Sequence, residues 1–207
     1  MDISLKNNYL VSYKAVAIYL AMTVLIGISI ILLSLGELEC MFISNLQNVI
    51  HKTLGIDFFS AVTYLGDFYV WSAFSIGFLL YAYYKNSQQK FDVSIELIVY
   101  LILITVSTYL LKLAFARPRP DCININVYNQ EAFFSYPSGH VSRATGALIT
   151  LSGRRNAVKT ALVIVAVLLL SISRIVLGVH FPTDILGGIF LSLAIQKATK
   201  VTICSFR

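Results

Sequence analysis

The sequence predicts an all-α integral membrane protein that forms one domain over residues 1–207 and crosses the membrane six times. Of its 207 residues, 57% are hydrophobic and only 13% are charged. A soluble domain has roughly 45–50% apolar and about 25% charged residues. The apolar residues are also gathered into runs close to the ~20 residues that a helix needs to cross the hydrocarbon core. Basic residues recur between alternate runs, which indicates a defined topology.

Six apolar segments account for most of the chain. They cover residues 15–35, 59–84, 95–116, 138–151, 158–177 and 183–198. The fourth is short and weakly apolar, and we include it partly because an odd number of spans would break the charge pattern. Between the first two, residues 38–58 have the apolar spacing of an amphipathic helix. This segment is expected to lie on the outer interface or, equally, to pack on the bundle as an ordinary loop helix.

With six spans, ten basic residues fall on one side of the membrane: Lys6, Lys14, Lys85, Lys90, Arg154, Arg155, Lys159, Lys197, Lys200 and Arg207. The positive-inside rule makes that side, and both termini, cytoplasmic. Residues 117–137 are then extracytoplasmic, like residues 36–58. The net charge of +6 is therefore explained mostly by topology. Because the charges are scattered in pairs, we expect anionic lipid headgroups as partners and no nucleic acid.

The three cysteines match neither a zinc site nor a CxxC pair. Cys40 and Cys122 both fall on the outer side, so this topology permits a disulfide between them. Cys204 falls on the inner side and is expected to be a free thiol.

The first block of chemical interest lies where the third span ends. Lys112 is followed seven residues later by Arg119, and Pro118 and Pro120 end the helix because proline lacks an N–H and clashes one turn back. The two cations would roughly share one face. Two other readings stay open: a lysine at a span end can simply reach the interface, and Arg117 offers a second register for an anion contact.

The second block is the tetrapeptide Pro-Ser-Gly-His at residues 137–140, which opens the fourth span. Ser138 and Gly139 at a helix start expose backbone N–H groups, to which the helix dipole adds partial positive charge. Gly139 also permits an anion to approach the backbone closely. The block therefore predicts an anion site beside His140, or, more simply, a helix capped by Ser138.

The third block joins the fifth and sixth spans. Arg174 lies near the outer end of the fifth span, and Gly178 allows a turn before His180. Asp184 follows four residues later, so its carboxylate can reach one ring nitrogen of His180 and leave the other free to attack. A histidine held by an aspartate can equally be structural. However, the ionisable residues of all three blocks map to the outer ends of the spans, where charge is costly and indicates function.

Together the blocks resemble the three signatures of the type 2 phosphatidic acid phosphatase superfamily. The matching stretches are Lys112-x6-Arg119-Pro120, Pro137-Ser138-Gly139-His140 and Ser173-Arg174-x5-His180-x3-Asp184. They occur in the family's order within residues 112–184, and the six-helix topology extends the resemblance to most of the chain. Three linked blocks are far more specific than any one of them alone.

The resemblance implies a membrane lipid phosphatase with a phosphohistidine intermediate. His180 would take the phosphoryl group, Asp184 would orient it, and His140 would protonate the leaving oxygen and then activate water. The phosphoryl oxygens would be held by Lys112, Arg119, Ser138, Gly139 and Arg174, with Ser173 in a supporting role. Since fixed cations supply the charge stabilisation, and the sequence has no carboxylate cluster for Mg²⁺, we expect no metal or other cofactor.

Two ionisable residues lie within the predicted spans but outside the blocks. Arg143 follows His140 by one helical turn, and Asp67 lies in the second span. Charged residues inside a membrane usually pair. We therefore expect an ion pair of Asp67 with Arg143 or with Arg174, in a supporting role.

The predicted substrate is a lipid phosphate, because the site lies at headgroup depth on the outer face of the cell membrane with only residues 117–137 above it. A polyprenyl diphosphate of the undecaprenyl or dolichyl type fits first, since a carrier lipid must lose a phosphate on that face before reuse. Phosphatidate and phosphatidylglycerophosphate follow, then phosphorylated lipid A. The sequence indicates no oligomeric state.

Three other functions stay open to different degrees. A lipid phosphotransferase would pass the phosphoryl group to a hydroxyl instead of water, and the blocks do not separate it from a hydrolase. Soluble vanadate haloperoxidases resemble the same blocks, but the apolar spans count against them. A non-enzymatic transporter or lipid-binding relative is the remote alternative. The complete set of blocks argues against it, because a relative without catalysis would be expected to lack a histidine or an arginine.

Overall fold

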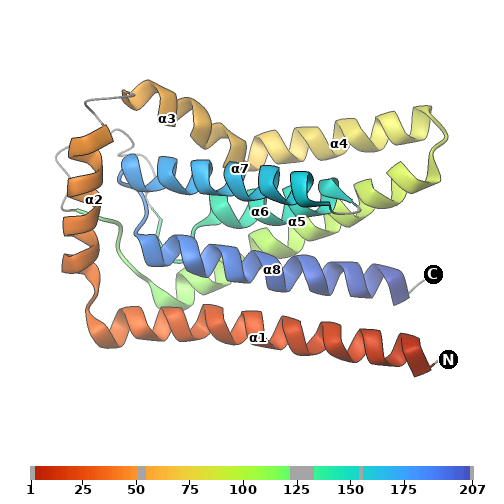
Figure 1. The fold of residues 1–207 in the computed structure, drawn as a ribbon, viewed down its shortest axis with the longest axis horizontal. Coiled ribbons are helices and arrows are strands. Elements are labelled where there is room, and N and C mark those ends of the chain that lie inside the picture. Colours follow the sequence, from red (N-terminus) through yellow and green to blue (C-terminus); the bar gives the residue numbers. More distant parts are fainter. Residues whose placement is uncertain (1–2, 51–54, 122–132, 154–155, 206–207) are drawn as a thin grey trace.

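The computed structural model describes residues 3–50, 55–121, 133–153 and 156–205, and the regular structure in these ranges is helical. The elements are α1 (Ile3–Leu33), α2 (Gly36–Ile50), α3 (Ile56–Thr63), η1 (Tyr64–Gly66), α4 (Phe68–Tyr84), α5 (Gln88–Phe115), α6 (Gly139–Ser152), α7 (Ala157–Val176) and α8 (Pro182–Ser205). Figure 1 shows the long helices running along one axis, with α2 standing across one end of them. A helix lies at every predicted span, and α2 forms in the predicted amphipathic segment.

Within the described ranges, three helices are long and apolar enough to cross a membrane: Val11–Leu33 of α1, Gln88–Phe115 and Ala157–Val176. A fourth span results if Ile56–Gly66 and Phe68–Tyr84, which meet at a bend of 48°, count as one. The helix α6 has 14 residues and is therefore ~21 Å long, short of the ~30 Å hydrocarbon core. The protein is thus a multi-pass membrane protein, whereas the number of six spans stays a prediction.

The predicted second span is broken at Asp67. The backbone there is extended, and the Asp67 carboxylate accepts a hydrogen bond from the Tyr69 amide at 3.0 Å, which caps α4. Just before the break, Gly66 lies against α6: a Cβ atom at this position would be 2.6 Å from Cβ of His140. The break therefore lets the η1 backbone approach His140 more closely than any larger residue would allow.

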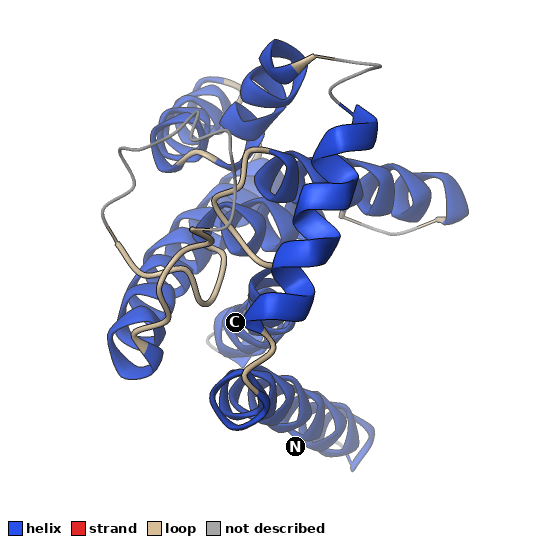
Figure 2. Cartoon of the chain, turned by 90° about the vertical axis from the view of Figure 1, so that its left-hand side faces the viewer, coloured by secondary structure: helices blue, strands red, loops and turns tan. Residues whose placement is uncertain are grey.

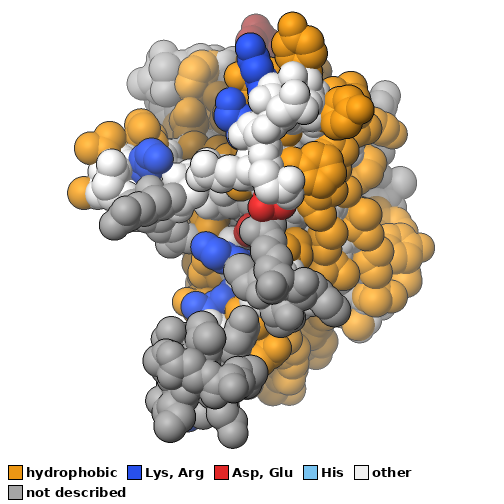
Figure 3. All heavy atoms as spheres, turned by 90° about the vertical axis from the view of Figure 1, so that its right-hand side faces the viewer, with side chains coloured by type: hydrophobic (Ala, Val, Ile, Leu, Met, Phe, Trp, Pro, Cys, Tyr) orange, Lys and Arg blue, Asp and Glu red, His pale blue; other side chains and the backbone are white. Residues whose placement is uncertain are grey.

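The two described chain ends lie at the same end of the bundle, opposite α2 (Figure 1). The turn between α4 and α5, with Lys85 and Lys90 beside it, also belongs to this end. Figure 3 shows Lys and Arg side chains at this end next to a flank covered by hydrophobic side chains. Three of the residues that the predicted topology places on this side, Arg154, Arg155 and Arg207, lie outside the described residues.

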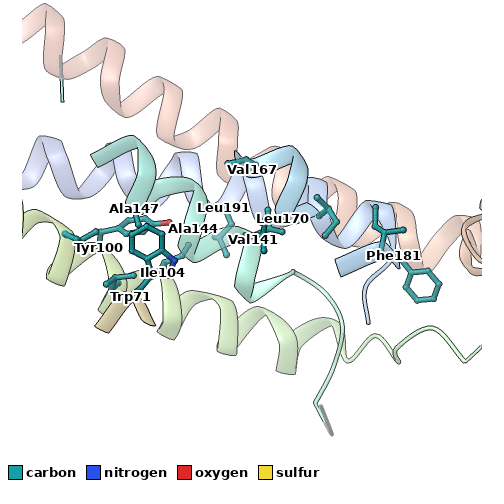
Figure 4. Close-up of a cluster of buried hydrophobic side chains, with 14 of the residues drawn as sticks. Trp71, Tyr100, Ile104, Val141, Ala144, Ala147, Val167, Leu170, Phe181 and Leu191 are labelled. Carbon is teal, nitrogen blue, oxygen red and sulfur yellow. The ribbon is translucent and has the colours of Figure 1, made fainter. Parts of the chain in front are cut away.

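The core lies between α5, α6, α7 and α8, and Figure 4 shows its centre. Tyr100 of α5 is fully buried there, and its hydroxyl donates to the Ser142 carbonyl at 2.5 Å and lies 2.8 Å from the Ser192 hydroxyl. The ring occupies the space beside Gly146, where a Cβ atom would be 2.2 Å from the nearest ring atom. This contact sets the distance between α5 and α6 and so the position of the α6 N-terminus.

We predict that Gly146→Ala destabilises the protein by about 1–3 kcal/mol, because the added methyl group overpacks the core against the Tyr100 ring. Gly77→Ala is the matched control: it lies in α4, and apart from the neighbouring residues of that helix no atom lies within 4 Å of where its Cβ would be. That change should be neutral or stabilising by up to about 1 kcal/mol. Thermal unfolding of both variants in detergent measures the difference, and equal midpoints would contradict the packing role of Gly146.

Candidate active site

The three sequence blocks meet at the end of the bundle covered by α2, which Figure 2 views directly. Lys112 lies in the last turn of α5 and Arg174 in the last turn of α7. Ser138 is the N-cap residue of α6, so His140 follows in the first turn. Asp184 lies in the first turn of α8, just after His180. Four separate helix ends therefore supply the residues that the sequence nominates.

The start of α8 holds His180 and Asp184 together. Pro182 occupies the first helical position, where a missing N–H costs nothing. The Asp184 carboxylate reaches back to accept from the Phe181 amide at 2.9 Å, and the same oxygen lies 3.4 Å from Nδ1 of His180. The latter distance exceeds the 2.7–3.2 Å of a tight N–H···O bond, as is common for catalytic contacts without substrate. A proton on Nδ1 would leave Nε2 with its lone pair.

Three cations surround this histidine, each held by bonds of its own. Lys112 donates to the carbonyls of Phe134 and Ser135. Arg119 donates through Nε to the carbonyl of Phe133 at 2.7 Å and through Nη1 to the carbonyl of Val179 at 2.7 Å.

The third cation is the most deeply buried. Arg174 is only 1% exposed, and its Nη1 donates to the Thr63 hydroxyl at 2.6 Å. Because N–H donors form directional hydrogen bonds, these contacts orient the three cations.

The α6 N-terminus differs from an ordinary capped helix start. The Ser138 side chain makes no capping hydrogen bond. Its hydroxyl is buried without a hydrogen-bond partner among the residues the structure describes. Its amide donates to the Asp184 carbonyl at 3.0 Å, which joins the starts of α6 and α8. Since the amides of a first turn lack intrahelical partners, the Ser138 hydroxyl and the Gly139 amide suit an anion.

The pKa of His180 lies well below its ordinary value of 6.5. Burial is the largest cause, because it disfavours the charged imidazolium, and the positive charges of Arg119, Arg174 and Lys112 act in the same direction, as does His140. These electrostatic effects also show that the blocks converge on this ring. His180 is therefore neutral at neutral pH, the form in which it can act as a nucleophile.

Arg117 does not serve as the second anion register left open by the sequence. Its Nη1 donates to Oδ1 of Asp184 at 2.6 Å, and its Nη2 pairs with the carboxylate of Glu39. Its guanidinium lies 3.9 Å from the centre of the Phe181 ring. The residue is buried and is committed to two carboxylates.

Sequence reasoning missed Glu39. A signal was present: Glu39, Ile43 and Gln47 are the buried residues of α2 and recur every four residues, which places them on one helix face. A carboxylate and an amide on the buried face of α2 indicate polar partners in the part of the protein on which that face packs. Helix α2 packs on the bundle end with this face, as the loop-helix interpretation requires, while Leu38 and Met41 stay exposed.

The expected ion pair of Asp67 with Arg143 or Arg174 is wrong for the described residues. Asp67 caps α4 instead, and Nε of Arg143 donates to the carbonyl of Gly66 at 3.2 Å. The break in the second span is the reason, since it turns the carboxylate toward α4 and presents a backbone carbonyl to α6.

Two further predictions concern side chains at the margin of the site. The Ser173 hydroxyl donates to the Leu170 carbonyl of its own helix at 2.7 Å, so its contact is local. Cys40 is disulfide-bonded, as the predicted outer disulfide requires, whereas Cys122 lies outside the described residues.

The family model of the PAP2 superfamily matches residues 93–203, which include all three blocks. The chain belongs to the PAP2 superfamily. Among curated PAP2 relatives, lipid A 4'-phosphatase of Porphyromonas gingivalis is 34% identical over 137 residues, covering 61% of this chain and 58% of the relative. Decaprenylphosphoryl-5-phosphoribose phosphatase of Mycobacterium tuberculosis is 36% identical over 90 residues, 42% of this chain and 48% of the relative. The chain thus spans about half the length of these relatives.

Solved structures show the same fold over a larger share of the PAP2 chain. A PAP2-type phosphatidylglycerolphosphate phosphatase from Bacillus subtilis has a TM-score of 0.73 at 21% identity, covering 94% of this chain and 98% of its own. LpxE of Aquifex aeolicus has a TM-score of 0.64 at 26% identity, covering 77% of this chain and 93% of its own. The helical arrangement is therefore the one seen in membrane phosphatases.

We predict that His180 titrates below pH 6.5 and that Arg119→Gln raises its pKa, since a positive charge that opposes protonation is removed. NMR of histidine-labelled protein measures both, because the chain has only three histidines and His180→Ala assigns the signal. Lys85→Gln, at the opposite end of the bundle, should leave the titration unchanged. A His180 titration at or above pH 6.5 in the unchanged protein would contradict the burial argument.

Proposed function

We propose that this PAP2 protein is an integral membrane lipid phosphatase that works through a phosphohistidine on His180. The observation that carries the proposal is the position of His180, which is held by Asp184 and surrounded by Lys112, Arg119 and Arg174. A neutral nucleophile amid fixed cations suits attack on a phosphate, whose negative charge would otherwise repel it.

In the first step, the lone pair of His180 Nε2 forms a bond to phosphorus while the bond from phosphorus to the lipid oxygen breaks. His140 donates a proton to that leaving oxygen. The imidazole then carries phosphate on Nε2 and a proton on Nδ1, so its ring is cationic, and Asp184 stabilises it. In the second step, His140 takes a proton from water, whose oxygen attacks phosphorus, and His180 leaves with its lone pair restored.

Positioning and charge supply most of the rate enhancement in phosphoryl transfer. The oxygens of the transferring group would be held by side chains of Lys112, Arg119, Arg174 and Ser138 and by the backbone amide of Gly139. Apart from Arg119, which follows α5, these donors come from three helix ends whose places are set by the packing of the bundle. The cradle therefore needs little rearrangement when charge shifts in the transition state.

The proposed substrate class is a lipid phosphate or diphosphate. The site lies at one end of a bundle whose flank is apolar (Figure 3), so a lipid tail can stay in the bilayer while its phosphate enters the cradle. The relatives differ in the lipid they are named for: lipid A, decaprenylphosphoryl-5-phosphoribose and phosphatidylglycerolphosphate. A polyprenyl diphosphate remains our first choice, with phosphatidylglycerophosphate, phosphatidate and phosphorylated lipid A as the alternatives.

We further propose that the active site faces the outside of the cell membrane. The support is the charge distribution: the end opposite the site carries Lys85, Lys90, Lys197 and Lys200, and basic residues favour the cytoplasmic side. The disulfide bond of Cys40 also fits an oxidising compartment.

The proposal predicts release of inorganic phosphate from at least one member of a panel of polyprenyl diphosphate, phosphatidylglycerophosphate, phosphatidate and lipid A in detergent. The His180→Ala variant should lose activity by a factor on the order of 10⁴ or more, because it removes the group that bonds to phosphorus. Lys200→Gln is the folded control. Full activity of His180→Ala would rule out the mechanism, and a phosphorylated acceptor in place of free phosphate would show a phosphotransferase.

We predict that hydrolysis persists in excess EDTA, because the cations of the cradle take the role that Mg²⁺ has in many phosphoryl transfers. Phosphate release is measured before and after chelation, followed by addition of Mg²⁺. Loss of activity on chelation and recovery with Mg²⁺ would show that a metal is required.

A further inference from the structure

Helix α2 brings a carboxylate to the site from outside the three blocks. It lies across the bundle end in Figure 2, where a hydrogen bond to α7 attaches it. The side-chain amide of Gln47 donates to the Val176 carbonyl at the end of α7 at 2.7 Å. Cys40, next to Glu39, is disulfide-bonded. The Glu39 side chain is therefore held in place on the inward face of an anchored helix.

Each contact of Glu39 is to a residue that itself adjoins Asp184. One carboxylate oxygen accepts from the Thr183 amide at 2.9 Å and from the Thr183 hydroxyl at 2.8 Å. The other oxygen pairs with Nη2 of Arg117. Nη1 of Arg117 in turn donates to the Thr183 hydroxyl at 2.8 Å and to Asp184 at 2.6 Å. Glu39 thus closes a hydrogen-bonded ring with Arg117 and Thr183 directly behind Asp184.

The charge of this ring bears on the chemistry of His180. A single guanidinium paired with Asp184 alone would be neutral, and its positive charge would cancel much of the carboxylate's field at the histidine. With Glu39 as a second buried carboxylate, the group of Glu39, Arg117 and Asp184 carries one net negative charge. That charge lies behind a ring that becomes cationic when Nε2 bonds to phosphorus and Nδ1 keeps its proton.

We propose that Glu39 is a positioning residue for phosphoryl transfer: it offsets the charge of Arg117, so that the group of Glu39, Arg117 and Asp184 keeps one net negative charge that stabilises the phosphorylated His180. The proposal rests on the phosphatase function proposed above. Glu39 acts through Arg117 and Asp184 and does not touch the phosphate.

The test is Glu39→Gln, which keeps the size and an accepting oxygen for Thr183 but removes the charge. The kcat for phosphate release should fall roughly 10- to 100-fold, because a buried charge next to the reacting ring is lost. The KM and the inhibition by inorganic phosphate should not change, because the three cations are held by other residues. Glu37→Gln is the matched control, since Glu37 lies exposed on the same helix and should keep the full kcat.

A double-mutant cycle separates this role from a purely structural one. If Glu39 works through Asp184, adding Glu39→Gln to Asp184→Asn should cost little more than Asp184→Asn alone. Combined with Lys112→Met, the two effects should multiply, because Lys112 acts on the phosphate. Multiplying effects in both pairs would overturn the proposal, as would a Glu39→Gln variant with a kcat within twofold of the unchanged protein or with a change confined to KM.

If Glu39→Gln fails to fold, the Glu39→Asp variant tests the proposal instead. This change keeps the charge and shortens the side chain by one methylene. Its kcat should fall severalfold with KM unchanged, and a kcat equal to that of the unchanged protein would overturn the proposal. Where both variants fold, equal losses in the two would show that charge is not the operative property. If the unchanged protein releases no phosphate from any lipid, the phosphatase function itself fails, which is a different result.

Discussion

The ion pair between Arg117 and Asp184 is the contact on which the rest of the site depends. Both side chains are almost fully buried, and their atoms are 2.6 Å apart. Removing one member of such a pair leaves an uncompensated buried charge, which costs about 3–5 kcal/mol. The pair also joins three parts of the chain, since Arg117 follows α5, Asp184 begins α8 and Glu39 brings in α2. The orientation of His180 therefore depends on helices that are far apart in sequence.

The short helix α6 is the second constraint, because it must present Ser138, Gly139 and His140 at the correct depth. Its position follows from close backbone and ring contacts: Tyr100 fills the space at Gly146, and Gly66 lies against His140. The amide of Ser138 donates a hydrogen bond to the carbonyl of Asp184. This bond fixes the position of the α6 N-terminus relative to the start of α8. A 14-residue helix enclosed by longer ones can begin at the site without reaching the far end of the bundle.

The sequence predicted the helices well because hydropathy, proline positions and charge are local signals, and it nominated the block residues because their spacing is family-specific. It did not predict the break at Asp67, since the close contact of Gly66 with α6 that accompanies the break involves residues far along the chain. The roles of Arg117 and Glu39 were missed for the same reason, because their pairing joins residues 78 positions apart. The only local signal for this pairing was the four-residue spacing that places Glu39 and Gln47 on one face of α2. Apolar length likewise does not settle whether α6 and α8 count as spans.

The charges around His180 explain why an anionic headgroup suits this site. In the described part of the chain, four cations (Lys112, Arg117, Arg119 and Arg174) and two carboxylates (Glu39 and Asp184) meet there. While His180 is neutral, the positive charges among these six described side chains outnumber the negative ones by two, at the edge of an apolar bundle. A phosphate group with close to two negative charges balances this excess. A divalent cation would raise this local charge further, which is the electrostatic reason for the prediction that hydrolysis persists in EDTA.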